Sequence, residues 1–139
     1  MGRKKYFTPR DIDPLIPELE EVFEHIKTCR ARAQALSSEI GPSKAEAGAA
    51  EVARLQLLRS QVQFLLEAVR DDVSHILALG GVTKDLEAGL VDFPGRLNGQ
   101  EVWLCWRRGE PAVGYWHALD QGFGGRQALP RPDPRTTFH

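Results

Sequence analysis

The chain has 139 residues, a length typical of one domain. Hydrophobic residues make up 42% and charged residues 27%, which are ordinary values for a soluble globular protein with a real core. The formal net charge of -1 excludes a general attraction to nucleic acid or to an anionic membrane, and no apolar run reaches the ~18 residues of a membrane span.

A long first helix is expected over about residues 9–40. Thr8 and Pro9 are typical of a helix start, and Gly41-Pro42 ends the pattern. Pro14 either starts a fresh turn or bends the helix, because proline removes an amide donor. Apolar residues recur in steps of three and four, which indicates a heptad seam like that of a coiled coil. The seam residues are Ile12, Leu15, Leu19, Val22, Ile26, Cys29, Ala33, Leu36 and Ile40.

A second helix is expected over about residues 44–79. Ser43 and Glu46 have the spacing of a capping box, and Gly80-Gly81 ends the helix. Its seam consists of Leu55, Leu58, Val62, Leu65, Val69 and Ile76. A short loop between two long helices predicts an antiparallel helical hairpin.

Two large apolar residues, Leu57 and Phe64, lie seven residues apart beside this second seam. They are either additional core or a subunit interface. A hairpin alone buries only one seam, so pairing of two hairpins into a four-helix arrangement is favoured, and a homodimer is predicted.

The apolar period changes after Gly81. Strands are expected at Val82–Asp85, Leu90–Phe93, Glu101–Arg107 and Ala112–His117, with a strong hairpin-turn signal at Asn98-Gly99. The result is a small antiparallel meander of three or four strands over about 82–126, packed on the open end of the hairpin. The fold class is therefore α+β, with one domain over 1–129 and a proline-rich, disordered tail over 130–139.

Polar residues within 89–126 form the candidate site, surrounded by Trp106, Tyr115 and Trp116. They are Asp92, Glu110, His117, Asp120 and Arg126. A ligand-binding interpretation puts them around an anion or a small molecule. A structural interpretation has Asp92 accepting backbone amides, Glu110 ordering a turn and Arg126 stacking on an aromatic ring.

No cofactor, metal or catalytic residue is predicted. His117 and Asp120 are too few for a metal site, and adding Glu110 gives no standard ligand spacing. Cys29 and Cys105 fit no metal or redox motif, so they are interpreted as buried free thiols in a reducing cytoplasm. Nucleotide, hydrolase and metalloprotease motifs are absent from the sequence.

The motifs together resemble the bacterial family known as domain of unknown function 2203, from Tyr6 to about Leu129. The residues that carry the resemblance are Phe7-Thr8, Leu15–Leu19, Lys84-Asp85, Gly89–Pro94, Leu104–Trp106, Gly109–Pro111, Tyr115–His117, Gly122-Phe123 and Gly125-Arg126. The resemblance implies a bacterial cytoplasmic protein with a helical hairpin and a small sheet, and it transfers no catalytic residues.

These observations favour a non-catalytic interaction or scaffold module that self-associates through its helical hairpin. The alternative is a small-molecule or anion-binding protein, or an enzyme, with a polar pocket in the sheet region. No nucleic-acid or membrane partner is expected.

Overall fold

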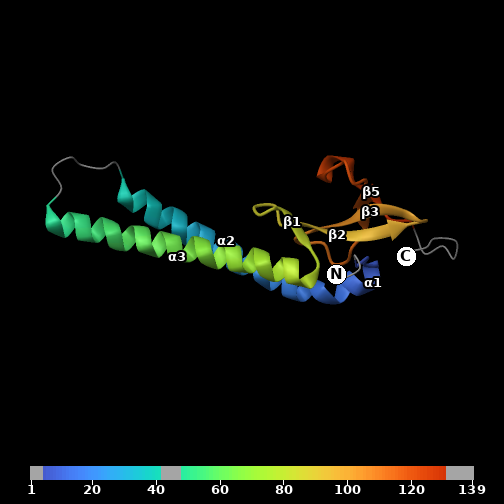
Figure 1. The fold of residues 1–139 in the computed structure, drawn as a ribbon, viewed down its shortest axis with the longest axis horizontal. Coiled ribbons are helices and arrows are strands. Elements are labelled where there is room, and N and C mark those ends of the chain that lie inside the picture. Colours follow the sequence, from blue (N-terminus) through green and yellow to red (C-terminus); the bar gives the residue numbers. More distant parts are fainter. Residues whose placement is uncertain (1–4, 42–47, 131–139) are drawn as a thin grey trace. The chain divides into compact units, whose positions relative to one another are not determined.

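The computed structural model of the chain describes residues 5–41 and 48–130 and shows an α+β architecture. It divides into two compact units. Of the described residues, the sheet unit comprises 5–23 and 75–130, and the helical unit comprises 24–41 and 48–74. Figure 1 shows the ribbon coloured from the N-terminus to the C-terminus, with the helices and strands of both units labelled.

The helical unit consists of parts of two long helices, α2 (Ile16–Ile40) and α3 (Ala49–Leu79), which run antiparallel within it (Figure 1). Its buried residues are Ile26, Cys29, Ala33 and Leu36 from α2 and Leu55, Leu58 and Val69 from α3. These positions belong to the two predicted seams, so the hairpin prediction is confirmed for the described residues. The predicted capping box at 43–46 lies outside them.

The first predicted helix begins in separate pieces. In α1 (Pro9–Ile12), the Thr8 hydroxyl accepts the Asp11 amide while the Asp11 carboxylate accepts the Thr8 amide, which completes a capping box. A short 3-10 turn, η1 (Asp13–Leu15), contains Pro14 and leads into α2. Of the two alternatives for Pro14, a fresh turn is the one observed, because the ring cannot donate within a continuous helix.

The sheet has five antiparallel strands in sequence order: β1 (Val82–Asp85), β2 (Leu90–Leu97), β3 (Gln100–Arg107), β4 (Tyr115–His117) and β5 (Gln127–Ala128). Asn98 and Gly99 have φ of 52° and 85° and join β2 to β3, as predicted from the turn signal. The strand expected from Ala112 begins only at Tyr115. Residues 127–128, which lie beyond the predicted sheet region, pair with β4 and bring the count to five instead of the predicted three or four.

One face of the sheet packs on residues of the same unit that come from α2 and from the segment before α1. Phe23 in α2 lies 6.1 Å from Trp106 between ring centroids, and Phe7 contacts Phe93 at 5.3 Å. Val91 and Leu104 on this face are also fully buried. Two helical carboxylates hold the turn after β3. Glu20 accepts the Gly109 amide and Asp13 accepts the Val113 amide. The sheet therefore has a fixed inner face, and alternate residues point to the other face.

Candidate functional site

The outer face of the sheet contains a buried polar cluster, in which β2 supplies Asp92, β3 supplies Cys105 and β4 supplies His117. Asp92 is the cross-strand partner of Cys105, while His117 pairs with Trp103, two residues along β3. Residues paired across strands share a face, as do residues two apart on one strand. The three residues are only 1–2% exposed, and one potential ligand atom from each lies within 4.8 Å of the others.

The hydrogen bonds of His117 define where its protons lie. Nδ1 is 2.9 Å from the Ala118 carbonyl oxygen, which can only accept, so Nδ1 carries a proton and donates it. Nε2 is 2.8 Å from Asp92 Oδ2, so a second proton lies between this nitrogen and the carboxylate. With that proton on either atom, the Asp92–His117 pair has no net charge. This neutrality is how a carboxylate is accommodated in a buried position.

Cys105 is held in its protonated form. Burial raises the pKa of its thiol to about 12, and the negative charge of Asp92 adds to this shift, while Arg126 opposes it. Because the thiolate is the reactive form of cysteine, Cys105 is not activated as a nucleophile.

A second polar pair lies on the other side of Cys105. Arg126 donates from its NH2 group to the Glu110 carboxylate at 2.8 Å and to the Cys105 carbonyl at 3.2 Å. Its guanidinium stacks 3.9 Å from the centre of the Tyr115 ring and 4.7 Å from that of Phe123. Glu110 also accepts the Arg107 amide at 2.6 Å. The pair thus ties the 123–126 segment to the turn after β3.

The predicted site residues therefore form two pairs that meet at Cys105. Asp92 and His117 lie at its thiol, and Glu110 and Arg126 lie near its backbone carbonyl. Asp120 is exposed, on the turn after β4. Cys105 was not among the predicted site residues. Counting back from the Asn98-Gly99 turn places it opposite Asp92, and this is the sequence signal that reveals it.

The helical unit has its own cluster of cysteine, histidine and carboxylate. His25 Nδ1 lies 2.5 Å from Asp72 Oδ2, and the Cys29 sulfur lies 3.6 Å from Nε2 and 4.0 Å from Nδ1 of the same ring. The residue types are those of a nucleophile, a base and an orienting acid. However, burial and the Asp72 charge raise the pKa of Cys29. The thiol also lies at similar distances from both ring nitrogens rather than being aligned with one, so the cluster lacks an activated nucleophile.

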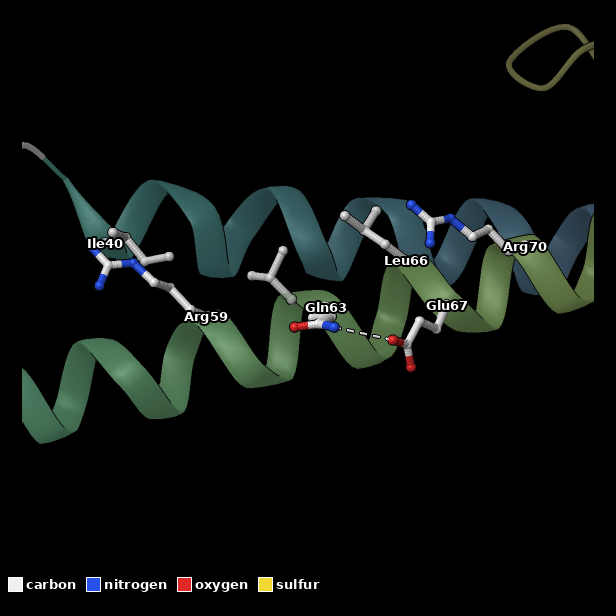
Figure 2. Close-up of a pocket in the computed structure, with 7 residues that line it drawn as sticks. Ile40, Arg59, Gln63, Leu66, Glu67 and Arg70 are labelled. Atoms are coloured by element: carbon white, nitrogen blue, oxygen red, sulfur yellow. Dashed lines mark hydrogen bonds between the residues drawn. The ribbon is translucent and has the colours of Figure 1, made fainter.

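Exposed apolar side chains and two grooves mark the surface of the helical unit. Phe64 is 71% exposed and Leu57 is 60% exposed, two turns apart on α3. A groove of about 340 Å³ beside them is lined by Arg32, Leu36, Ser60, Gln61, Phe64 and Leu65. Another groove of about 300 Å³, shown in Figure 2, is lined by Ile40, Arg59, Val62, Gln63, Leu66, Glu67 and Arg70. In it, Gln63 donates to Glu67 at 3.2 Å.

The family match covers almost all of these features. The sequence model of a family described as "Uncharacterized conserved protein (DUF2203)" matches residues 5–129. The chain belongs to this family. The DUF2203 match includes both long helices, the five strands and both polar pairs of the sheet, which confirms the resemblance found in the sequence. No curated protein and no solved structure matches the chain. Among the described residues of this DUF2203 protein, no helix has both the length and the apolar character needed to cross a membrane.

Proposed function

We propose that this protein is a non-catalytic interaction module that forms a homodimer through its helical unit. The observation that carries the proposal is the exposure of Phe64, together with that of Leu57, on one flank of α3. Large apolar side chains in such a row favour burial against a partner, at roughly 1.5–3 kcal/mol for each fully buried side chain.

A second copy of the chain fits this flank because the flank is self-complementary. The Phe64 ring is part of the wall of a groove that Leu36 and Leu65 also line. In a two-fold dimer, each surface patch meets its own copy, so the ring of each protomer has the groove of the other within reach. Two helix pairs joined in this way form a four-helix arrangement, with coiled-coil packing of the seams.

The polar clusters support a non-catalytic role. Asp92 pairs with His117 and Glu110 pairs with Arg126, so these groups satisfy one another. The pKa of each thiol is raised, which disfavours a cysteine nucleophile. We also propose that the protein is located in a bacterial cytoplasm and has no nucleic-acid or membrane partner. The two buried free thiols in the described chain are suited to a reducing compartment.

The oligomeric state tests the proposal directly. We expect size-exclusion chromatography with light scattering to give the mass of a dimer at tens of micromolar protein. A monomer under these conditions would overturn the proposal.

A charge on the apolar flank tests the interface. Phe64→Asp removes two rings from a symmetric dimer and places two carboxylates there, so we expect dimerisation to weaken at least about 100-fold. Gln56→Asp is the matched control, since it adds the same charge to an exposed position on α3 that does not line the Phe64 groove. Circular dichroism should show unchanged helix content in both variants. A Phe64→Asp protein that remains dimeric, or that unfolds, contradicts the assigned interface.

A further inference from the structure

We propose that Asp92, Cys105 and His117 together bind one divalent transition-metal ion of the zinc class, as a structural site in the outer layer of the sheet. The three residues belong to adjacent, hydrogen-bonded strands. Their ligand atoms already lie within 4.8 Å of one another. A ligand set held by a sheet in this way needs little further ordering to bind an ion.

His117 is oriented as a metal ligand. Its Nδ1 donates to the Ala118 carbonyl at 2.9 Å, so Nε2 is the nitrogen that faces Asp92 and Cys105. Histidines that bind metals commonly donate their other ring N–H to a backbone carbonyl in this way, which fixes both the tautomer and the ring orientation.

Asp92 provides an independent observation. Its side chain is 3% exposed, and its Oδ1 atom is buried without a hydrogen-bond partner among the described residues. The Cys105 thiol, a weak donor, also interacts with this carboxylate and thereby contributes to the raised pKa of the thiol. A buried carboxylate oxygen with no donor at hydrogen-bonding distance costs free energy, which this weak interaction offsets only in part. Coordination to a cation supplies the missing interaction.

The charges of the ligands identify the class of ion. A thiolate and a carboxylate together neutralise a divalent ion, and a neutral imidazole adds no charge, so the filled site has no net charge to bury. Sulfur and imidazole ligands suit zinc and similar transition metals, whereas calcium and magnesium prefer oxygen ligands.

Binding requires a small local movement. With metal–ligand bonds of ~2.0–2.1 Å, the nitrogen and oxygen ligands of a tetrahedral site are about 3.3 Å apart. His117 Nε2 must therefore release Asp92 Oδ2, now 2.8 Å away, so that Nε2 and the unpartnered Oδ1 can both face the ion. The proton between Nε2 and Oδ2 and the Cys105 thiol proton leave as the ion enters. A water molecule takes the fourth tetrahedral position. Since the three protein ligands are almost completely buried, the ion joins three strands and gives no access to a substrate.

Cobalt(II) is the probe of choice because thiolate coordination gives it a charge-transfer absorption band. The full chain is denatured with a chelator present and then refolded with cobalt or zinc, which removes any barrier to entry. We expect one ion per chain by native mass spectrometry, the charge-transfer band with cobalt, and a raised Tm with zinc. A refolded protein that takes up no ion overturns the proposal.

Single-residue variants locate the ion. Cys105→Ser should abolish the cobalt charge-transfer band, while Cys29→Ser, the matched control at the other buried cysteine, should keep it. Asp92→Asn, which preserves shape and hydrogen bonding with His117, should lose the rise of Tm with zinc but still fold. A band that persists in Cys105→Ser or disappears only in Cys29→Ser places the ion elsewhere and contradicts the assignment.

Discussion

At the scale of single residues, Asp92 and His117 are two polar side chains buried in the sheet unit, and each depends on the other as its hydrogen-bond partner. The two side chains are 2–3% exposed and lie 2.8 Å apart. Each side chain lowers the free-energy cost of burying the other, because the shared proton leaves the pair without net charge. Removing one partner from such a pair leaves the other polar group buried alone, which costs much more than the pair itself contributes.

His117→Ala is therefore expected to destabilise the protein by about 3–5 kcal/mol, because it leaves the Asp92 carboxylate buried without its partner. Asp92→Asn should cost less, since its amide can donate to Nε2 of a neutral imidazole. Urea denaturation measures both changes. His75→Ala serves as the control at a half-exposed histidine and should change the free energy of unfolding by less than about 0.5 kcal/mol. Equal losses in His117→Ala and His75→Ala would refute the importance of the buried pair.

Cys105 makes the stability of the metal-free protein sensitive to alkaline pH. Its pKa is about 12 in the folded protein and 9.0 in its ordinary state, so the folded protein holds this proton more tightly than the unfolded chain. The contribution is constant below pH 9 and is lost as the pH rises toward 12. The expected slope is about 1.4 kcal/mol per pH unit.

Cys105→Ala should remove this contribution, so its free energy of unfolding should fall less steeply with pH. Urea denaturation at several values above pH 9 compares the slopes rather than the absolute stabilities, since other groups titrate in both proteins. Parallel curves for the two proteins would show that the thiol titrates in the same way in the folded and unfolded states.

At the scale of elements, the sequence predicted those helix ends and turns that depend only on neighbouring residues. The Thr8-Pro9 start, the Leu79 end of α3 and the Asn98-Gly99 turn all appear where the sequence places them. The turn also fixes the register of β2 and β3, since pairing of Leu97 with Gln100 carries Asp92 to Cys105. The position of Cys105 opposite Asp92 could therefore be predicted from the sequence.

The position of His117 beside these two residues could not be predicted in this way. The connection from β3 to β4 spans residues 108–114, and its shape depends on distant acceptors, namely Asp13 for the Val113 amide and Glu20 for the Gly109 amide. No local rule gives the register after a turn that is held by tertiary contacts. Strand β5 was missed for the same reason, because its two residues owe their conformation to β4.

The junction after α3 gives a sharp test of local geometry. Gly80 has φ of +106°, and a Cβ atom there would lie 2.1 Å from Cζ of Phe7. Phe7 packs against Phe93 in the core of the sheet unit, so it has little room to move. We expect Gly80→Ala to destabilise the protein by about 2 kcal/mol or more, through strain at positive φ and overpacking.

Gly122→Ala is the control for that substitution. Gly122 has φ of -121°, and an added Cβ there meets nothing within 4 Å. Its effect on the free energy of unfolding should stay below about 0.5 kcal/mol. Chemical denaturation of both variants measures the difference. An unchanged free energy of unfolding in Gly80→Ala would mean that the Phe7 side chain moves aside at little cost.

At the scale of the whole molecule, each unit encloses an apolar core and leaves other large apolar side chains exposed, among them Leu77 at 62% in the sheet unit. The sheet unit encloses Trp106, Phe93, Leu104 and Val91 completely. The helical unit buries one seam and leaves Phe64 and Leu57 largely exposed. Self-association through the helical unit would bury Phe64 and Leu57, and it makes a prediction about the thermal stability of the protein.

Dimerisation predicts that Tm rises with protein concentration, because mass action favours the folded dimer over the unfolded chains. Differential scanning calorimetry over a hundredfold range of concentration measures this dependence. Phe64→Asp should have a Tm that is independent of concentration, whereas Gln56→Asp should behave like the unmodified chain. If all three proteins show the same concentration dependence, the association involves a surface other than the Phe64 flank. If none shows any, the folded chain is a monomer and the exposed row on α3 has another role.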